Sequence, residues 1–337
     1  MSAALERALS GAVFSRAEMR ALVREIMSGA LDEVQIAALL AAFRTRGETL
    51  DEIVGAAEAM RELALPLPEA PAGAIDTCGT GGDGANTFNI STVSALVVAA
   101  AGVPVAKHGN RAASSRCGSA ELLEALGVEI EIPPQAMARA VAEVGFGFLY
   151  SRACHPAMAR VAPVRAKLGV RTIFNRLGPL TNPMRVRRQL VGVAVEALVE
   201  PTLAALVELG SERAWVVHGQ DGLDELSISA PTRVAAYADG RTEHFIVGHG
   251  DLVPASPREQ IVGGDAAENA RIARAVLGGE KGPRRDAVLL NSAAALCVAG
   301  RAPDLRAGIA ISEQALDSGR ASELLERFVA FTRGAAR

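Results

Sequence analysis

The spacing of apolar residues predicts helices over the first 65 residues. Between residues 19 and 27, apolar side chains recur every three or four positions, which places them on one face of a helix. Ser15 and Glu18 precede this run in the pattern of a capping box, and Gly29 follows it as a helix end. A second apolar stripe ends at Gly47, and a third begins after it with another capping box. We expect these helices to pack together through their apolar faces.

A stiff stretch, Pro66–Gly73, then separates these helices from a region with a different rhythm. Short β-prone runs alternate there with helical ones. The strand candidates are residues 74–77, 103–106, 128–132, 146–150, 189–193 and 214–218, and the helix candidates are 91–101, 119–127 (capped by Ser119), 134–144 and 201–209. Asp239-Gly240 predicts a hairpin between the runs 234–237 and 244–247, and the C-terminal third is helical again.

This order predicts an α/β fold in two parts. Alternating strands and helices favour a mainly parallel central sheet covered by helices. We therefore expect a small all-helical N-terminal domain, residues 1–66, joined by hinges to a large α/β domain, residues 74–337. No internal repeat is visible.

Composition narrows the class of partners. The net charge is −3 and only 4% of residues are aromatic, so the chain has neither the basic surface nor the stacking side chains of a nucleic-acid-binding protein. The longest apolar stretch, residues 93–106, is too short to span a membrane. The four cysteines are scattered without a C-x-x-C pair, and the N-terminus lacks a signal-peptide core. We expect a cytoplasmic protein.

Two loops could bind an anion. Cys78–Thr92 is rich in glycine and runs into a predicted helix, whose N-terminus favours negative charge. It is neither a P-loop nor a dinucleotide fingerprint, and its Ser and Asn residues would also serve as ordinary helix caps. Lys107–Ser119 follows a predicted strand and contains cations and small polar residues, and no Asp or Glu occurs between Asp83 and Glu121. The alternative for this second loop is a surface loop with chance cations.

Charge is also unevenly distributed farther along the chain. Residues 144–195 contain no acidic residue but nine basic ones, more than a small anion needs, so most of these belong to the surface or an interface. Adjacent Asp224 and Glu225 follow a predicted strand. Two carboxylates at a strand end are suited to Mg²⁺, although most such dipeptides are solvated turns.

Together and in this order, these stretches resemble the anthranilate phosphoribosyltransferases, which perform the second step of tryptophan synthesis from chorismate. The resemblance covers nearly the whole chain, to about Gly300. It is carried by Gly79–Asp83, Asn86–Thr92, Lys107–Ser119, His155–Lys167, Phe174–Pro183, Gly222–Ser227 and Gly264–Ala270. Gly79–Asp83 also resembles pyrimidine nucleoside phosphorylases and is not diagnostic alone.

The resemblance implies a reaction and a set of partners. Anthranilate would attack C1 of phosphoribosyl pyrophosphate (PRPP) with Mg²⁺ as cofactor, giving N-(5-phosphoribosyl)anthranilate and pyrophosphate. It also implies that a helical pair near residues 158–178 completes the small domain, and that two copies of the chain join through this domain as a homodimer. No nucleic acid or membrane is expected to take part.

The resemblance further implies roles for individual residues. Residues expected to bind PRPP are Gly79, Gly82, Asp83, Thr87, Asn89, Ile90, Ser91, Thr92, Lys107, His108, Gly109, Asn110, Arg111, Ala112, Ala113, Ser114, Ser115 and Ser119. Residues expected to bind anthranilate are Gly79, His108, Asn110, His155, Arg165 and Gly178. Ser91, Asp224 and Glu225 are expected to hold Mg²⁺. An aryl amine is already neutral near pH 7, so no residue is expected to be catalytic in the sense of an obligatory general base.

Two alternatives stay open at this stage. A pyrimidine nucleoside phosphorylase would share the fold and the first glycine loop, whereas the acidic pair and the Asn110/Arg165 pair favour the transferase. A nucleic-acid-binding protein of the same fold would need a broad basic surface, which a chain with a pI near 6.0 does not offer.

Overall fold

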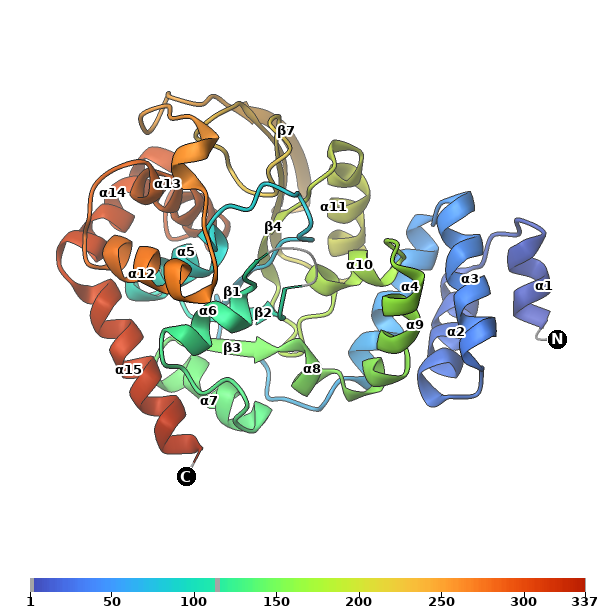
Figure 1. Cartoon of the computed structure of the whole chain (residues 1–337). Helices are drawn as coiled ribbons and strands as arrows, with labels where there is room; N and C mark the ends of the chain where they lie inside the picture. The colour runs from blue at the N-terminus through green and yellow to red at the C-terminus, as the bar shows by residue number, and fades with distance from the viewer. Residues whose placement is uncertain (1–2, 113–115, 337) are drawn as a thin grey trace.

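The N-terminal part of the molecule is a group of packed helices (Figure 1). The computed structural model describes residues 3–112 and 116–336. Its first helices are α1 (Ala3–Leu9), α2 (Arg16–Ser28), α3 (Glu33–Arg46) and α4 (Leu50–Leu63). Capping boxes at Ser15, Asp32 and Thr49 begin α2, α3 and α4, and left-handed Gly29 ends α2. The helix pattern and the caps read from the sequence are therefore confirmed.

Glu52 fixes the packing of these helices from the inside. Its side chain is fully buried, it completes the Thr49 capping box, and it accepts a hydrogen bond from the N–H of Phe14 at 2.9 Å. The guanidinium of Arg46 pairs with the same carboxylate. One carboxylate thus connects the loop before α2, the end of α3 and the start of α4.

The large part of the molecule is built on a seven-stranded sheet in the order β3-β2-β1-β4-β5-β6-β7. The strands are β1 (Ile75–Thr77), β2 (Val105–Gly109), β3 (Phe146–Tyr150), β4 (Arg188–Gly192), β5 (Arg213–Gly219), β6 (Thr232–Ala238) and β7 (Arg241–Val247). The first five strands pair in parallel, and the β6–β7 hairpin is added antiparallel to β5. The expectation of an α/β fold with a mainly parallel sheet is confirmed.

The order of the strands decides where a ligand can enter. The chain goes from β1 outward to β2 and β3, and then returns to the other side of β1 with β4. Loops that leave the carboxyl ends of β1 and β4 therefore diverge, which opens a crevice at this edge of the sheet. The glycine-rich loop follows β1, the cationic loop follows β2 and the acidic pair follows β5.

Helices cover the sheet (Figure 1). They are α5 (Ile90–Ala100), α6 (Ser119–Ala125), α7 (Pro134–Glu143), α11 (Val199–Glu208), α12 (Ala266–Leu277), α13 (Pro283–Val298), α14 (Leu305–Asp317) and α15 (Arg320–Ala335). Buried α5 and α13 pack on each other in the middle of the larger hydrophobic core. Phe146 of β3 meets Phe328 of α15 edge to face, so the C-terminal helix closes the same core.

Short helices fill the connection between β3 and β4. They are α8 (Ser151–Cys154), η1 (Pro156–Arg160), α9 (Ala162–Leu168), α10 (Phe174–Leu177) and η2 (Gly178–Leu180), while η3 (Glu196–Leu198) and η4 (Arg258–Ile261) lie in later loops. η1 contacts α2, α9 contacts α3 and α10 contacts α4. In Figure 1 these green segments lie against the blue N-terminal helices.

Two local predictions are wrong. Residues 128–132 form no strand, although Val128, Ile130 and Ile132 are all buried. They pack into the core from a turn between α6 and α7, and β3 already ends the sheet on that side. Ser119 is the first residue of α6 instead of its cap; Gly118 holds the cap position, and its N–H donates to Glu121 at 3.0 Å. Within the described residues, no helix is long and apolar enough to cross a membrane.

We expect Glu52→Ala to lower the free energy of unfolding by about 3 kcal/mol, because it leaves Arg46 and two backbone N–H groups without their acceptor. Urea unfolding followed by circular dichroism measures this loss. Glu62→Ala is the matched control, since Glu62 pairs with Arg20 at the surface of the same helix, and should cost about 1 kcal/mol or less. Equal losses in the two variants would show that burial of Glu52 contributes nothing.

Candidate active site

The glycine-rich loop lies against the acidic pair. Gly81 donates its N–H to Asp224 Oδ2 at 2.8 Å, so the loop after β1 is attached to the loop after β5. A Cβ at Gly79 would lie 2.8 Å from the same carboxylate oxygen, which leaves room there only for glycine. Gly82 has a φ of +74°, a conformation that other residues rarely adopt. The glycines thus serve close approach and a left-handed turn.

Glu225, the second member of the acidic pair, reaches the start of α5. Its Oε1 accepts the N–H of Ser91 at 3.1 Å, and the hydroxyl of Ser91 lies 3.3 Å from Lys107 Nζ. Lys107 also donates to the carbonyl of Thr77 at the end of β1. The end of β1 and the start of α5 therefore meet at a single cation, and Ser91 connects them to the acidic pair.

The acidic pair carries more negative charge than its surroundings balance. Burial raises the pKa of Asp224, and nearby Asp83 adds repulsion. Burial likewise raises the pKa of Glu225, with repulsion from Asp224 as the next cause and attraction to Lys107 opposing it. Both side chains keep part of their surface open. A divalent cation at this opening would relieve the repulsion.

The donor set at this place fits Mg²⁺, which prefers carboxylate oxygens together with water and substrate phosphates. Asp224, Glu225 and Ser91, which line the same crevice, can supply oxygen donors. Among the described residues there is no group of three or more His, Cys, Asp or Glu side chains that could hold a metal ion without further ligands. The arrangement therefore suits a metal that arrives with, or is completed by, a phosphorylated ligand.

The N-terminus of α5 supplies further polar groups. Asn89 is its cap residue by position, but its side chain donates to the carbonyl of Cys117 at 3.0 Å and accepts from Asn269 Nδ2 at 2.9 Å. Asn89 therefore connects the glycine-rich loop to the cationic loop and to α12. Thr92 and Ile90 are buried, and Ile90 belongs to the hydrophobic core. The side chain of Ile90 serves packing, and its N–H donates to the carbonyl of Phe88 at 2.7 Å.

A second group of predicted residues, His108, His155 and Gly178, lies together in the interior. His108 Nδ1 lies 3.0 Å from the carbonyl of Gly178, and the His108 and His155 rings lie 5.2 Å apart. Burial lowers the pKa of His108 to about 3 and that of His155 to about 4, so both imidazoles are neutral at physiological pH. Their Nε2 atoms are buried and have no hydrogen-bond partner within the described chain. Unpartnered ring nitrogens of this kind indicate a place for a small polar ligand.

The cationic loop is only partly directed toward these groups. Exposed Asn110 accepts a hydrogen bond on its backbone carbonyl from Ser119 Oγ at 3.2 Å. Arg111 points elsewhere, because its guanidinium makes a two-pronged ion pair with Glu124 and a hydrogen bond to Tyr150. Gly109 ends β2 and Ala112 follows Arg111. Ala113, Ser114 and Ser115 lie outside the described residues.

The other predicted residues have different neighbours. Arg165, on α9, has its guanidinium 5.9 Å from the ring of Phe174, and burial lowers its pKa. The structure shows no direct contact between Arg165 and Asn110. Asp83 accepts the N–H of Ala85 at 3.1 Å, and Thr87 forms an isolated bridge with Val262.

Sequence analysis missed several residues that hold this region together. Asp76 and Asn182 form a buried hydrogen bond at 2.9 Å beneath the His108 strand end. Asn291 of α13 bonds both the N–H and the carbonyl of Leu226, next to Glu225. Arg171 donates to the carbonyl of Gly81 at 2.5 Å. The sequence contains one signal that could have identified such residues. It is a polar residue inside a predicted apolar strand or helix, as at Asp76 and Asn291.

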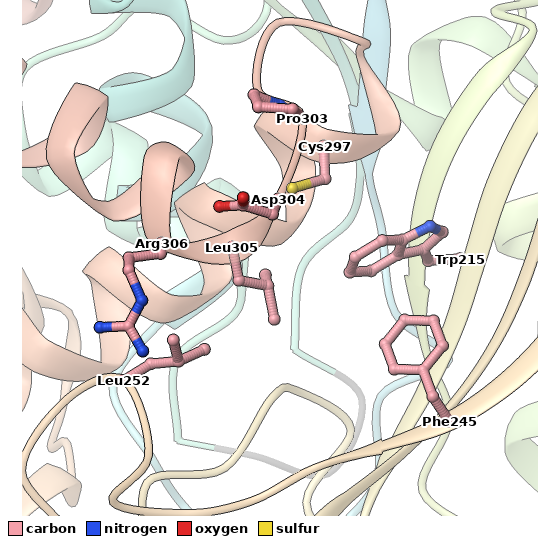
Figure 2. A pocket seen from close by; sticks show the side chains of 8 residues that line it. All are labelled: Trp215, Phe245, Leu252, Cys297, Pro303, Asp304, Leu305 and Arg306. Atoms are coloured by element: carbon pink, nitrogen blue, oxygen red, sulfur yellow. The ribbon is translucent and has the colours of Figure 1, made fainter.

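A larger apolar cavity of about 440 Å³ lies elsewhere and shares none of these residues (Figure 2). Trp215 and Phe245 form its strand side, Leu305 faces them from the start of α14, and Arg306 extends toward Leu252. The crevice that touches the acidic pair is smaller and is lined by Thr77, Gly79, Ser91, Asp224, Glu225 and Asn291, among others. The polar groups converge on the smaller one, which is our candidate site.

Known protein families match both parts of the chain. Residues 2–64 match the model of the glycosyl transferase family helical bundle domain, and residues 72–322 match that of the glycosyl transferase family α/β domain. Anthranilate phosphoribosyltransferase from Symbiobacterium thermophilum is 50% identical over 333 residues, covering 98% of each chain. The enzyme of that name from Desulfosudis oleivorans is 50% identical over 334 residues, again covering 98% of each chain.

Solved structures agree with this result. The crystal structure of anthranilate phosphoribosyltransferase from Thermus thermophilus is 47% identical, with a TM-score of 0.93 over 98% of this chain and 100% of that one. The Saccharomyces cerevisiae enzyme in complex with PRPP and Mg is 28% identical, with a TM-score of 0.86 over 95% of this chain and 94% of that one. On the strength of two family models, half-identical relatives and this agreement in fold, the chain belongs to the anthranilate phosphoribosyltransferase family of glycosyl transferases.

Proposed function

We propose that this chain transfers the 5-phosphoribosyl group of PRPP to anthranilate, which gives N-(5-phosphoribosyl)anthranilate and pyrophosphate in the second step of tryptophan synthesis from chorismate. The observation that carries the proposal is the meeting of the glycine-rich loop, the N-terminus of α5, Lys107 and the acidic pair, beside two neutral histidines. Groups that suit an anion therefore lie next to groups that suit a neutral amine.

On the donor side, the proposed PRPP contacts come from four segments. Gly79–Asp83 and Asn89–Thr92 would offer backbone N–H groups, Lys107 would bring the cation, and the loop after β2 is the fourth segment. Asp224, Glu225 and Ser91 would hold Mg²⁺, in keeping with the Mg in the yeast complex with PRPP. When bound, the ion would neutralise the negative charge that accumulates on the departing pyrophosphate.

The bonds now made by the acidic pair are the ones that substrate binding would replace. Asp224 accepts from Gly81 and Glu225 accepts from Ser91, so backbone donors of the proposed phosphate loops are satisfied internally in this structure. A diphosphate can take over these N–H groups and release the carboxylates. Replacing a carboxylate by a phosphate as the acceptor keeps the number of hydrogen bonds the same, so the exchange costs little free energy.

On the acceptor side, Arg165 and Asn110 are the proposed contacts for the anthranilate carboxylate, with His108, His155, Gly79 and Gly178 around the ring. A guanidinium can bind a carboxylate through two parallel hydrogen bonds. The yeast enzyme in complex with 4-fluoroanthranilate, 26% identical with a TM-score of 0.82, shows that a relative binds such an analogue. The neutral histidines add no second positive charge beside the amine.

The reaction leaves the protein a task of positioning and charge neutralisation. Cleavage of the C1–O bond makes the ribose ring positive and the pyrophosphate more negative, and the amine nitrogen supplies the electron pair for the new bond. The proton lost by the amine after attack can pass to pyrophosphate or water, so no side chain need act as general base. Loss of anthranilate fluorescence with PRPP and Mg²⁺ tests this function, and an unchanged signal would reject it.

We further propose a homodimer joined through a helical domain made of residues 1–66 and the helical segments near 158–178, hinged to residues 74–337. Large exposed apolar side chains on the N-terminal helices and their loops support this, since Leu9, Val13 and Val34 are 61%, 55% and 78% exposed. A cytoplasmic location is supported by the free thiols of Cys78, Cys154 and Cys297.

We expect Arg165→Ala to raise the KM for anthranilate roughly 30- to 150-fold and to leave the KM for PRPP nearly unchanged, because a charged hydrogen-bonding contact to one substrate is lost. Steady-state kinetics with each substrate varied in turn measures the difference. Lys167→Ala is the control, since Lys167 lies on the same helix but pairs with Glu33 at the surface. Equal changes for both substrates would show that Arg165 is misassigned.

The pair Asp224→Asn with Glu225→Gln should need much more Mg²⁺ for activity and bind anthranilate as before. Stability provides a second readout. Because burial raises the pKa of both carboxyls, the unchanged chain loses stability as the pH rises above the usual carboxyl range. With EDTA the double variant should therefore have the higher Tm at about pH 8 and no advantage near pH 4, where both carboxyls are protonated. An unchanged Mg²⁺ requirement would contradict the assignment.

We expect Val34→Glu combined with Leu9→Glu to convert the dimer to monomers in sedimentation velocity, because two charges would be buried at the proposed contact. Ile246→Glu on β7 is the control, since Ile246 is 55% exposed but lies on the antiparallel hairpin. A dimer that survives the helical substitutions and dissociates with Ile246→Glu would place the interface on the sheet edge.

A further inference from the structure

Asp76 is a carboxylate enclosed by protein at the junction of both halves of the proposed site. It lies in β1 between Ile75 and Thr77 and has no exposed surface. Its Oδ1 accepts the N–H of His108 at 3.1 Å, and its Oδ2 accepts from Asn182 Nδ2 at 2.9 Å. Burial of a carboxylate is costly unless hydrogen bonds satisfy it, and an apolar residue could not make the bonds that Asp76 makes.

The bond to His108 controls the peptide from which the two half-sites diverge. Lys107 and His108 are consecutive in β2, so their side chains point to opposite faces of the sheet. The ammonium of Lys107 goes to Thr77 and Ser91, on the side of the acidic pair. The ring of His108 goes to Gly178 and His155, on the side of the acceptor pocket. The N–H held by Asp76 belongs to the peptide group between them.

The bond to Asn182 extends the same anchor to the connection between the two parts of the chain. Asn182 is buried, and its Nδ2 also donates to the carbonyl of Ala106 at 2.8 Å while its Oδ1 accepts the N–H of Met184 at 3.0 Å. Its segment follows η2, whose first residue, Gly178, accepts from the His108 ring. β1, β2 and the segment 178–184 are therefore pinned at one point.

No other residue at position 76 can keep both hydrogen bonds that Asp76 accepts. An amide at position 76 would have to turn its NH₂ either toward the N–H of His108 or toward the NH₂ of Asn182. Turning over Asn182 offers no escape, because its NH₂ would then face the N–H of Met184 and its oxygen would face the carbonyl of Ala106. Only a carboxylate accepts from both sides. Burial raises the pKa of this carboxyl to about 6, against the attraction of Lys107.

We infer that Asp76 is a positioning residue for both substrates at once, which holds the Lys107–His108 peptide against β1 and fastens it through Asn182 to the segment that carries Gly178. The inference rests on the proposed function for the identity of the two substrates. Loss of this pin would displace the PRPP side and the anthranilate side together.

The test is a KM and kcat comparison of Asp76→Asn with the unchanged chain. We expect the KM for PRPP and the KM for anthranilate both to rise, each roughly 10- to 100-fold, since displacements of about 1 Å have effects of this size. Thr332→Val is the matched control, because buried Thr332 likewise accepts a backbone N–H, from Glu129, far from the crevice. A variant that only folds less completely would lower kcat and keep both KM values, and that result would overturn the inference.

A second variant keeps the test of this pin decisive. If Asp76→Asn does not fold, Asn182→Ala serves instead: it keeps the bond to His108 and should raise the KM for anthranilate more than that for PRPP. Unchanged KM values there would also overturn it. An unchanged chain that consumes no anthranilate would reject the proposed function, which separates the two failures.

Discussion

A carboxylate that the fold shields from water must be met by hydrogen-bond donors, and around this crevice the donors are mainly backbone N–H groups. Asp76 takes the N–H of His108, Asp224 that of Gly81 and Glu225 that of Ser91. Each bond joins two segments that are far apart in the sequence. The loops at the carboxyl ends of β1, β2 and β5 are thus held in place by negative charge, and a site for an anionic substrate is built on anionic supports.

Because carboxylates hold these loops, a nearby positive charge is needed to balance their negative charge. Lys107 is the one cation that lies among Thr77, Ser91 and the acidic pair in the described structure, and it is shared between the strand end and the helix start. Loops held by carboxylates can change partners when a phosphate competes for the same N–H groups, whereas loops held by apolar packing could not. The arrangement suits a site that must admit and release a highly charged molecule.

Much of the fold could be predicted because its signals are local. Capping boxes begin α2 and α4, and Asp239-Gly240 turns the β6–β7 hairpin, as the sequence indicated. The error at residues 128–132 has a tertiary cause. Alternating buried side chains fit a strand equally well, but a strand also needs a neighbour, and the sheet already ends at β3. No pattern within five residues contains that information.

The candidate site, like the fold, could be predicted only in part. Resemblance and strand-end placement located the acidic pair and the glycine-rich loop, which do come together. Asp76 and Asn182 were missed because their partnership spans 106 residues and leaves no spacing to detect. The resemblance assigns Arg111 to PRPP binding, and its charge is visible in the sequence, whereas its ion pair with Glu124 depends on how α6 packs. Sequence patterns therefore reveal charged residues more readily than the residues that form ion pairs with them.

The cavity beside β5 has a practical consequence for studying how the two parts of the chain unfold. Trp215 is the only tryptophan in the sequence, and it lies edge-on to Phe245 on the antiparallel side of the sheet (Figure 2). The helices α1–α4 contain none. Intrinsic tryptophan emission consequently monitors the sheet alone, whereas far-ultraviolet dichroism sums the helices of both parts. Coincident curves from the two probes would indicate a single cooperative unit, and separated curves would resolve the order in which the parts melt.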